Sequence, residues 1–351
     1  MPLPGTKLSQ FDHSPSPPAA TDVLVGVQSP NSAPHDFLYT VAQVASAIGP
    51  LLPPVRTILT QPTSYYVNAS TGSDSTGNGS SGNPWQTLTK ANHFLQTNID
   101  FGGQRVDLIL QAAGTYPTSV DATNHVDWGG YVGGGILSIH GATNAPASYI
   151  VTDSTHSYNG NGAFAFPFST LTQIRIDQLT MKANQLASSA VYLPSLTSVF
   201  VANFWNDGLA QNFAVDFSAP AANGPNGFET LCGNLIIQGT CAVTVPTGGN
   251  FINSWYATNA SQLGGNGVLE SFTTYTFNAG FALGSFGFCQ AGAAVAGIML
   301  EDGDTFIFTT GSATGKRFTV ANGALVNTFG AGLNYFPGTT AGTITTGGQY
   351  L

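Results

Sequence analysis

The segment Gln173-Ile174-Arg175-Ile176 alternates between polar and aliphatic residues, which is typical of a short β-strand. Similar segments follow at Ser198-Val199-Phe200-Val201 and Asn234-Leu235-Ile236-Ile237. Over residues 117–325 such segments recur roughly every 20–40 residues, and the connections between them are rich in Asn, Gly and Thr. Few of these connections have a helical pattern, so we exclude a fold of alternating β and α units.

Two β architectures remain. A sandwich would place hairpins at a tighter spacing of ~8–12 residues. A parallel β-helix stacks coils of about the observed length, and each coil carries two or three short strands. Aliphatic side chains and Phe would fill its interior, while Asn, Gly and Thr would form its corners. We therefore predict a mainly β protein built around a parallel β-helix.

The composition excludes several classes of partner. Only 7% of the 351 residues are charged, and eight Lys and Arg against seventeen Asp and Glu give a net charge of −9. Eight cations cannot neutralise a phosphate backbone, so we predict no nucleic-acid partner. No apolar run reaches ~18 residues, so we predict no membrane insertion. The first residues lack a basic segment followed by an apolar one, so we expect no secretory signal.

Cofactor and metal motifs are missing from the sequence. The three cysteines, Cys232, Cys241 and Cys289, lack metal-binding spacing and are too few for a disulfide framework, so we expect buried free thiols. The segment from Gly311 to Arg317 has neither the spacing nor the hydroxyl of a phosphate-binding P-loop. We therefore predict no cofactor and no metal.

Residues 1–64 form a region of their own, with eleven of the twenty prolines. Such segments favour extended geometry and linkers. A short strand is predicted at Asp22–Val27, and a Thr-x-x-Gln capping box at Thr40–Gln43 opens a short helix. That helix is marginal alone, so its apolar face needs another chain or protein to pack against. The candidate contact residues are Leu24, Val25, Phe37, Val41, Val44 and Ile48.

Residues 65–116 show a different pattern. A strand is predicted at Tyr65–Asn68, followed by a loop rich in Gly, Ser and Asn over Thr71–Asn83. A helix follows Pro84-Trp85-Gln86-Thr87-Leu88, and a strand at Val106–Leu110 ends at a turn over Gly114–Tyr116. The helix is short and apolar on one side.

These residues carry a family resemblance. The 65–116 pattern resembles the opening of right-handed parallel β-helix proteins of the pectin-lyase-like class, in which a strand, a loop and a short helix cap the first coil. Residues 21–45 are similar to the particle-anchoring segment of bacteriophage tail fibres and tail spikes. The ending Asn334-Tyr335-Phe336-Pro337-Gly338 looks like phage fibre and spike endings. The implied order is an anchor and linker over 1–64, a cap over 65–116, a right-handed parallel β-helix over 117–325 and a closing segment over 326–351.

The resemblance implies a function and a location. The chain would be a structural virion protein, a homotrimeric spike or short fibre assembled in the bacterial cytoplasm and extracellular when mature. Residues 1–64 would dock to other tail or capsid proteins, and the β-helix would recognise a host-surface polysaccharide. One alternative is a polysaccharide depolymerase on the same fold. A second alternative is a bacterial surface adhesin, against which the lack of a secretory signal argues.

Glycoside hydrolysis needs two carboxylates near the cleaved bond. Asp177 and Asp207 are about one coil apart in the sequence, and Glu229 and Glu270 form the next candidate pair. We favour a structural role for all four, since Asp207-Gly208 is a turn dipeptide and Asp177 ends a strand. Because carboxylates are scarce, binding without cleavage is the preferred function.

Two further groups have competing interpretations. The acidic segment Glu301-Asp302-Gly303-Asp304 could hold a hard cation, but Asp-Gly between two strand-like runs first indicates a hairpin turn, which we favour. Trp205, Trp255 and Tyr256 are candidates for stacking on sugars, although aromatic side chains in a β-helix more often pack against one another.

Overall fold

A computed structural model of the protein describes part of the chain in full: residues 56–118, 126–152, 162–183, 189–202, 211–218, 226–245, 251–252, 254–258, 267–292, 297–301 and 303–351. It also describes the backbone of residues 23–27 and 36–40. The chain divides into two compact units, Met1–Val55 and Arg56–Leu351.

The first unit contains one described pair of strands. Strand β1 (Val23–Val27) pairs in antiparallel fashion with β2 (Asp36–Thr40). The strand predicted at 22–27 is therefore confirmed. Leu24, Val25 and Phe37 lie on this pair, whereas the other candidate anchoring residues, Val41, Val44 and Ile48, lie outside the described residues.

The second unit opens with the predicted strand, loop and helix. Strand β4 (Thr63–Val67) leads through the loop to helix α2 (Leu88–Asn98), and β6 (Arg105–Leu110) follows. The Thr87 hydroxyl caps α2 by accepting a hydrogen bond from the Lys90 N–H at 3.1 Å. Asp74 holds the loop against this helix start, because its carboxylate accepts from the Gln86 and Thr87 N–H groups at 2.8 and 3.0 Å. The short strands β3 (Thr57–Ile58) and β5 (Ile99–Asp100) pair beside them.

The turn predicted over Gly114–Tyr116 is wrong. These residues belong to strand β7 (Gly114–Pro117), which pairs in parallel with β9 (Tyr149–Thr152). A Gly-Thr-Tyr sequence suits a turn locally, but pairing with the next coil overrides that preference.

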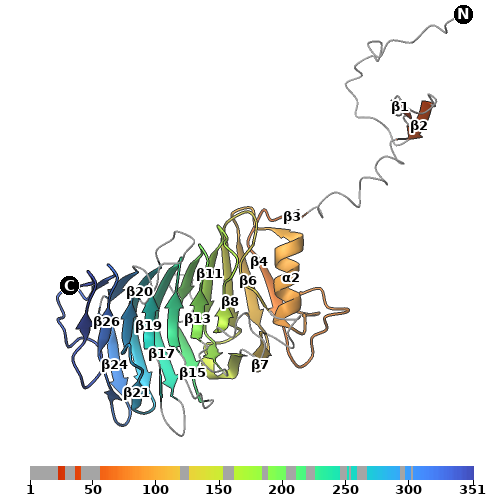
Figure 1. The fold of residues 1–351 in the computed structure, drawn as a ribbon. Coiled ribbons are helices and arrows are strands. Elements are labelled where there is room, and N and C mark those ends of the chain that lie inside the picture. Colours follow the sequence, from red (N-terminus) through yellow and green to blue (C-terminus); the bar gives the residue numbers. More distant parts are fainter. Residues whose placement is uncertain are drawn as a thin grey trace, which may run out of the picture. The chain divides into compact units, whose positions relative to one another are not determined.

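Two long parallel sheets organise the rest of the unit (Figure 1). The fifteen-stranded sheet, called here the long sheet, continues from β4 and β6 through strands of successive coils. These are β8 (Ile136–Gly141), β11 (Gln173–Asp177), β14 (Ser198–Val201), β17 (Asn234–Thr244), β20 (Val268–Phe277), β23 (Ile298–Glu301), β27 (Leu325–Asn327) and β29 (Gln349–Tyr350). Also in this sheet are β7 and β9, together with β12 (Thr180–Lys182), β15 (Asn212–Asp216) and β24 (Thr305–Phe308).

The second sheet has seven strands, all taken from the same coils. They are β10 (Gly162–Ala165), β13 (Ser189–Leu193), β16 (Asn226–Thr230), β19 (Ser254–Thr258), β22 (Cys289–Ala291), β26 (Phe318–Val320) and β28 (Thr343–Ile344). A three-stranded sheet adds β18 (Phe251–Ile252), β21 (Phe281–Leu283) and β25 (Ala313–Thr314), and a 3₁₀ turn, η3, spans Pro146–Ser148. Each named strand of this unit pairs with its neighbour in parallel.

Register between the coils builds the core. Leu137 pairs with Ile174 and Ile174 with Val199, so successive coils advance by 37 and then 25 residues (174 − 137 and 199 − 174). Loops absorb this difference in length while the inward column stays in line. Its members are completely buried: Val106, Leu137, Ile174, Val199, Leu235, Leu269, Met299 and Val326.

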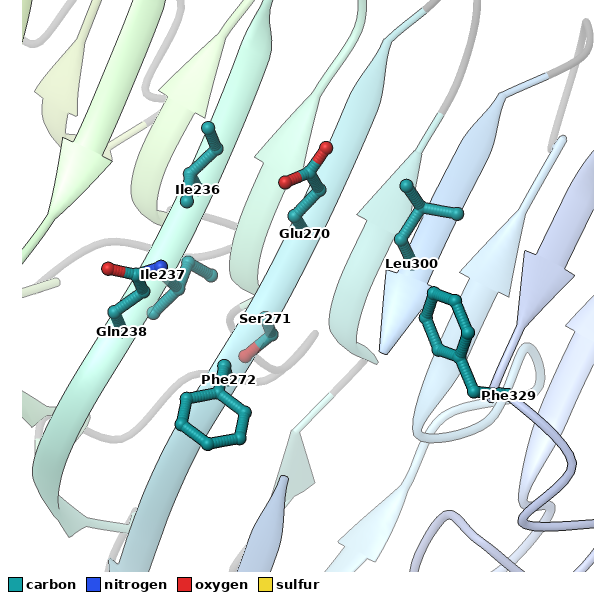
Figure 2. Close-up of a pocket in the computed structure, with 8 residues that line it drawn as sticks. All are labelled: Ile236, Ile237, Gln238, Glu270, Ser271, Phe272, Leu300 and Phe329. Atoms are coloured by element: carbon teal, nitrogen blue, oxygen red, sulfur yellow. The ribbon is translucent and has the colours of Figure 1, made fainter. Parts of the chain in front are cut away.

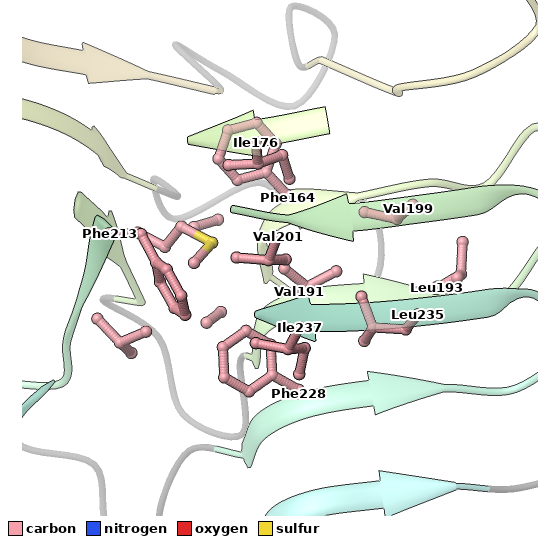
Figure 3. Close-up of a cluster of buried hydrophobic side chains, with 14 of the residues drawn as sticks. Phe164, Ile176, Val191, Leu193, Val199, Val201, Phe213, Phe228, Leu235 and Ile237 are labelled. Atoms are coloured by element: carbon pink, nitrogen blue, oxygen red, sulfur yellow. The ribbon is translucent and has the colours of Figure 1, made fainter. Parts of the chain in front are cut away.

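The interior is filled from both long sheets. In Figure 3, Val199 and Leu235 of the long sheet and Leu193 of the seven-stranded sheet gather in the space between them. Burying such side chains supplies most of the driving force for the stack, at about 1.5–3 kcal/mol for each. The prediction of a mainly β chain of stacked parallel strands, with a helix near its start, is confirmed.

No helix among the described residues has the length and apolar character needed to span a membrane.

Candidate functional site

A groove of about 370 Å³ lies on the outer face of the long sheet. Eight of the described residues line it, as Figure 2 shows. Ile236, Ile237 and Gln238 lie on β17, Glu270, Ser271 and Phe272 lie on β20 and Leu300 lies on β23, whereas Phe329 lies in the turn that follows β27. Glu270 of β20 pairs in register with Ile236 of β17 and Leu300 of β23. Because side chains alternate along a strand, the buried Leu269 places Glu270 on the outer face.

Glu270 is partly buried and is the groove's carboxylate. It has no hydrogen-bond or ion-pair partner anywhere in the described part of the chain. The side chains paired with it on either strand, Ile236 and Leu300, are aliphatic. The Gln238 amide supplies a second polar group in the same groove. Among its described residues, the groove therefore presents one carboxylate and one amide beside apolar side chains and the buried Ser271.

Two aromatic rings stand exposed at the groove. Phe272 is 60% exposed and Phe329 is 59% exposed. Phe329 has φ +51°, a left-handed conformation that is uncommon for a bulky residue and costs about 1–2 kcal/mol. The Asn327 carboxamide oxygen holds this conformation by accepting from the Phe329 N–H at 2.9 Å. The rings offer flat apolar faces to a ligand.

Sequence reasoning found only one residue of this groove. Glu270 was a candidate as a catalytic acid, while Phe272 was overlooked although the alternation in Val268–Phe277 places both side chains on one face. Phe329 reaches the groove from the C-terminal segment through an unusual backbone conformation. No local pattern in the sequence predicts this conformation or the position of the ring.

The first candidate carboxylate, Asp177, is completely buried. Its carboxylate lies 2.7 Å from the Arg175 guanidinium and accepts from the Gln178 N–H at 2.8 Å. Burial raises the pKa of Asp177 to about 6, although Arg175 opposes the shift. A side chain so enclosed does not reach a polysaccharide. Asp207 and Trp205 lie outside the described residues.

The second candidate pair is split between sheets. Glu229 lies on β16 of the seven-stranded sheet, where it accepts a hydrogen bond from the Ser189 hydroxyl at 3.1 Å. Glu270 lies on β20 of the long sheet, so the two residues are not on neighbouring strands.

Trp255 and Tyr256 are completely buried on β19. Trp255 packs edge-on against Phe228, Tyr275 and Phe277, with ring centres 5.1–5.6 Å apart. Both side chains belong to the interior aromatic cluster, so neither one is placed to stack on a sugar at the surface.

The acidic segment 301–304 is not a hairpin. Strands β23 and β24 both pair in parallel with the same strand, β20: Glu301 pairs with Ser271, and Thr305 with Thr274. Three residues therefore oppose two, which is the pattern of a β-bulge. Gly303 takes φ +86°, where a glycine is favoured. The extra residue lets Glu301 and Asp304 both face the interior, whereas residues three apart in a regular strand face opposite sides.

Asp304 organises a buried polar network. Its carboxylate accepts from the Tyr256 hydroxyl at 2.5 Å, the Ser271 hydroxyl at 2.8 Å and the Thr273 N–H at 2.6 Å. The Tyr335 hydroxyl in turn accepts from the Asp304 N–H at 2.7 Å. This network ties β19, β20 and the C-terminal segment to the bulge.

Glu301 is completely buried beside this network. Burial and the nearby Asp304 carboxylate raise the pKa of Glu301 well above its ordinary value of 4.5. Burial also raises the pKa of Asp304, but its hydrogen-bond donors oppose that shift. Glu301 is therefore the member of the pair for which the fold more strongly favours the protonated form.

Among the described residues, no group of three or more His, Cys, Asp or Glu side chains could hold a metal ion. Cys232, Cys241 and Cys289 are buried free thiols, as predicted.

Comparison with known proteins adds no relative: no family model, no curated protein and no solved structure matches this chain.

Replacing Asp177 by Asn should lower the free energy of unfolding by about 3–5 kcal/mol, because the buried Arg175 charge loses its carboxylate. Chemical denaturation measures this loss. Asp107→Asn is the matched control, since Asp107 pairs with Arg105 at 2.7 Å with the same spacing but is partly exposed. That control should lose about 1 kcal/mol or less. Equal losses in the two variants would contradict a structural role for Asp177.

Stability should also depend on the proton of Glu301. The folded chain binds this proton more tightly than the unfolded chain, so its contribution is complete below pH 4.5 and is lost as pH rises toward the raised pKa. The slope is up to about 1.4 kcal/mol per pH unit. Glu301→Gln should remove this component, whereas the control Glu270→Gln should keep it. Unfolding free energies across a pH series measure the effect, and parallel curves for wild type and Glu301→Gln would refute it.

Proposed function

We propose that the chain is a structural virion protein, a trimeric tail spike or short fibre. In this proposal, its stacked strands form a right-handed parallel β-helix that binds a host-surface polysaccharide without cleaving it, and residues 1–64 dock to the particle. The observation that carries the binding role is the outer groove, where Phe272 and Phe329 expose their rings beside Glu270 and Gln238.

The groove suits a saccharide for physical reasons. A pyranose ring has an apolar face of C–H groups and an edge of hydroxyls. The exposed rings can pack on the face of C–H groups. The carboxylate can accept hydrogen bonds from the hydroxyls, and the amide can accept from them or donate to them. The groove is open and lies on the outside of the stack, so it can take an internal segment of a long chain.

Two features support the virion assignment. The division at Val55 and Arg56 gives the N-terminal segment a unit of its own, as an anchor requires. The stack also exposes large apolar side chains elsewhere, among them Leu171 at 90% and Leu196 at 60%. Such side chains, at adjacent corners of the long sheet, suit contacts between copies of the chain.

The depolymerase alternative keeps one supporting observation, the position of Glu270 in the groove. Hydrolysis by two carboxylates requires a second acid about 5–10 Å away. No second carboxylate lines this groove among the described residues. Binding alone is therefore the function that the geometry supports best.

Purified host capsule or lipopolysaccharide should bind the protein, and Phe272→Ala and Phe329→Ala should each weaken binding about fivefold, the equivalent of about 1 kcal/mol. Ile58→Ala is the control, since it removes an apolar side chain that is 64% exposed and lies outside the groove. Chromatography of the incubated polysaccharide should show no released oligosaccharide. Release would establish the depolymerase, and unchanged binding in both Phe variants would reject the groove.

Removal of residues 1–55 should abolish attachment to the particle while the second unit keeps its β circular dichroism and its trimeric mass. The physical reason is that the chain divides after Val55 and the second unit contains the stacked core. Incorporation into particles and light scattering measure the two properties. Attachment of the shortened chain would reject the anchor, and a monomeric mass of the intact protein would reject the trimer.

A further inference from the structure

We propose that the outer groove selects a glycan that carries a protonated amine, with the Glu270 carboxylate pairing with the ammonium group of an amino sugar. This inference rests on the proposed glycan-binding function and adds the chemical class of the ligand.

The surroundings of Glu270 favour a cationic ligand. Its carboxylate is partly withdrawn from water, it stands between Ile236 and Leu300, and it has no partner among the described residues. A carboxylate without a partner gains more from a charge-assisted hydrogen bond to a cation than from a hydrogen bond to a neutral hydroxyl. An ammonium group supplies that charge and three hydrogen-bond donors.

Phe272 forms an aromatic side of the groove near Glu270. Phe272 lies two residues from Glu270 on the same outer face of β20, as Figure 2 shows. Aromatic faces attract cations as well as apolar C–H groups. A sugar ring packed on Phe272 can therefore present an amine to Glu270 without placing it against an unfavourable surface.

Phe329 combines an unfavourable backbone conformation with an exposed ring. Its left-handed backbone is unfavourable for a bulky residue, yet its ring remains 59% exposed and gains little burial in return. Strain that does not serve packing points to a use at the surface. The ring closes the side of the groove beyond Leu300 and would limit the ligand's orientation.

The charge of the groove and of the whole chain also favours a cationic ligand. None of the eight groove residues is Lys, Arg or His, and the whole chain carries a net charge of −9. The field of the protein therefore repels acidic glycans and attracts cationic ones. An amino sugar with a free amine carries a positive charge, which is attracted both by the Glu270 carboxylate and by the net negative charge of the chain.

The test compares a β-linked glucosamine tetramer with its fully N-acetylated counterpart, which has the same rings but no charge. Isothermal titration at a pH where the amines are protonated should show the amine tetramer binding at least tenfold more tightly. Glu270→Gln should remove this preference, and added salt should weaken it. Glu229→Gln is the control, since that carboxylate lies on the other sheet, and it should keep the preference.

Three results would overturn the inference: no binding of the amine tetramer, equal binding of the two tetramers, or an unchanged preference in Glu270→Gln. Tighter binding of a tetralysine peptide than of the amine tetramer would also overturn it, in favour of a protein ligand. A different result would reject the proposed glycan-binding function. If host polysaccharide still binds in a manner that depends on Phe272 and Phe329, glycan binding stands and only the amine is rejected.

Discussion

Parallel pairing in register between successive coils is the constraint on which the structure depends. Val199 must lie beside Ile174, and Leu235 beside Val199, for the inward column to remain continuous. A slip of one residue would turn the aliphatic side chains outward and bring polar ones into the core. The coils differ in length, so the corners and loops take up the difference while the strands keep their alignment. This leaves the outer face of the long sheet regular enough to carry a groove.

The bulge between β23 and β24 shifts this register by one residue, and the shift has a chemical consequence. One additional residue brings Glu301 and Asp304 to the same side of the sheet. Two carboxylates then share an interior that otherwise holds aromatic rings. Hydrogen bonds to Asp304 and the raised pKa of Glu301, which favours its neutral form, lower the electrostatic cost of that arrangement. Two carboxyl groups thus lie inside the stack at the bulge, whereas the Glu270 carboxylate lies on the outer face, in the groove.

The sequence predicted local elements better than their pairing. Aliphatic alternation located the strands at 136–139, 173–176, 198–201 and 234–237, and the segment Pro84–Leu88 located the start of the helix. The parallel bulge was taken for a hairpin, because Asp-Gly has the same local preference in both settings. Asp177 was a candidate acid because its burial depends on contacts that no linear pattern encodes. Phe329 was missed because a distant segment brings it to the groove.

The central claim is that the regular outer face of the stack recognises a ligand at the groove around Glu270. A cryo-electron microscopy structure of the assembled protein in the presence of the glucosamine tetramer tests it most directly. The account predicts stacked parallel coils with Glu301 and Asp304 inside and sugar density against Phe272 and Phe329. A neighbouring copy of the chain seated over these two rings, with no sugar density there, would contradict the claim.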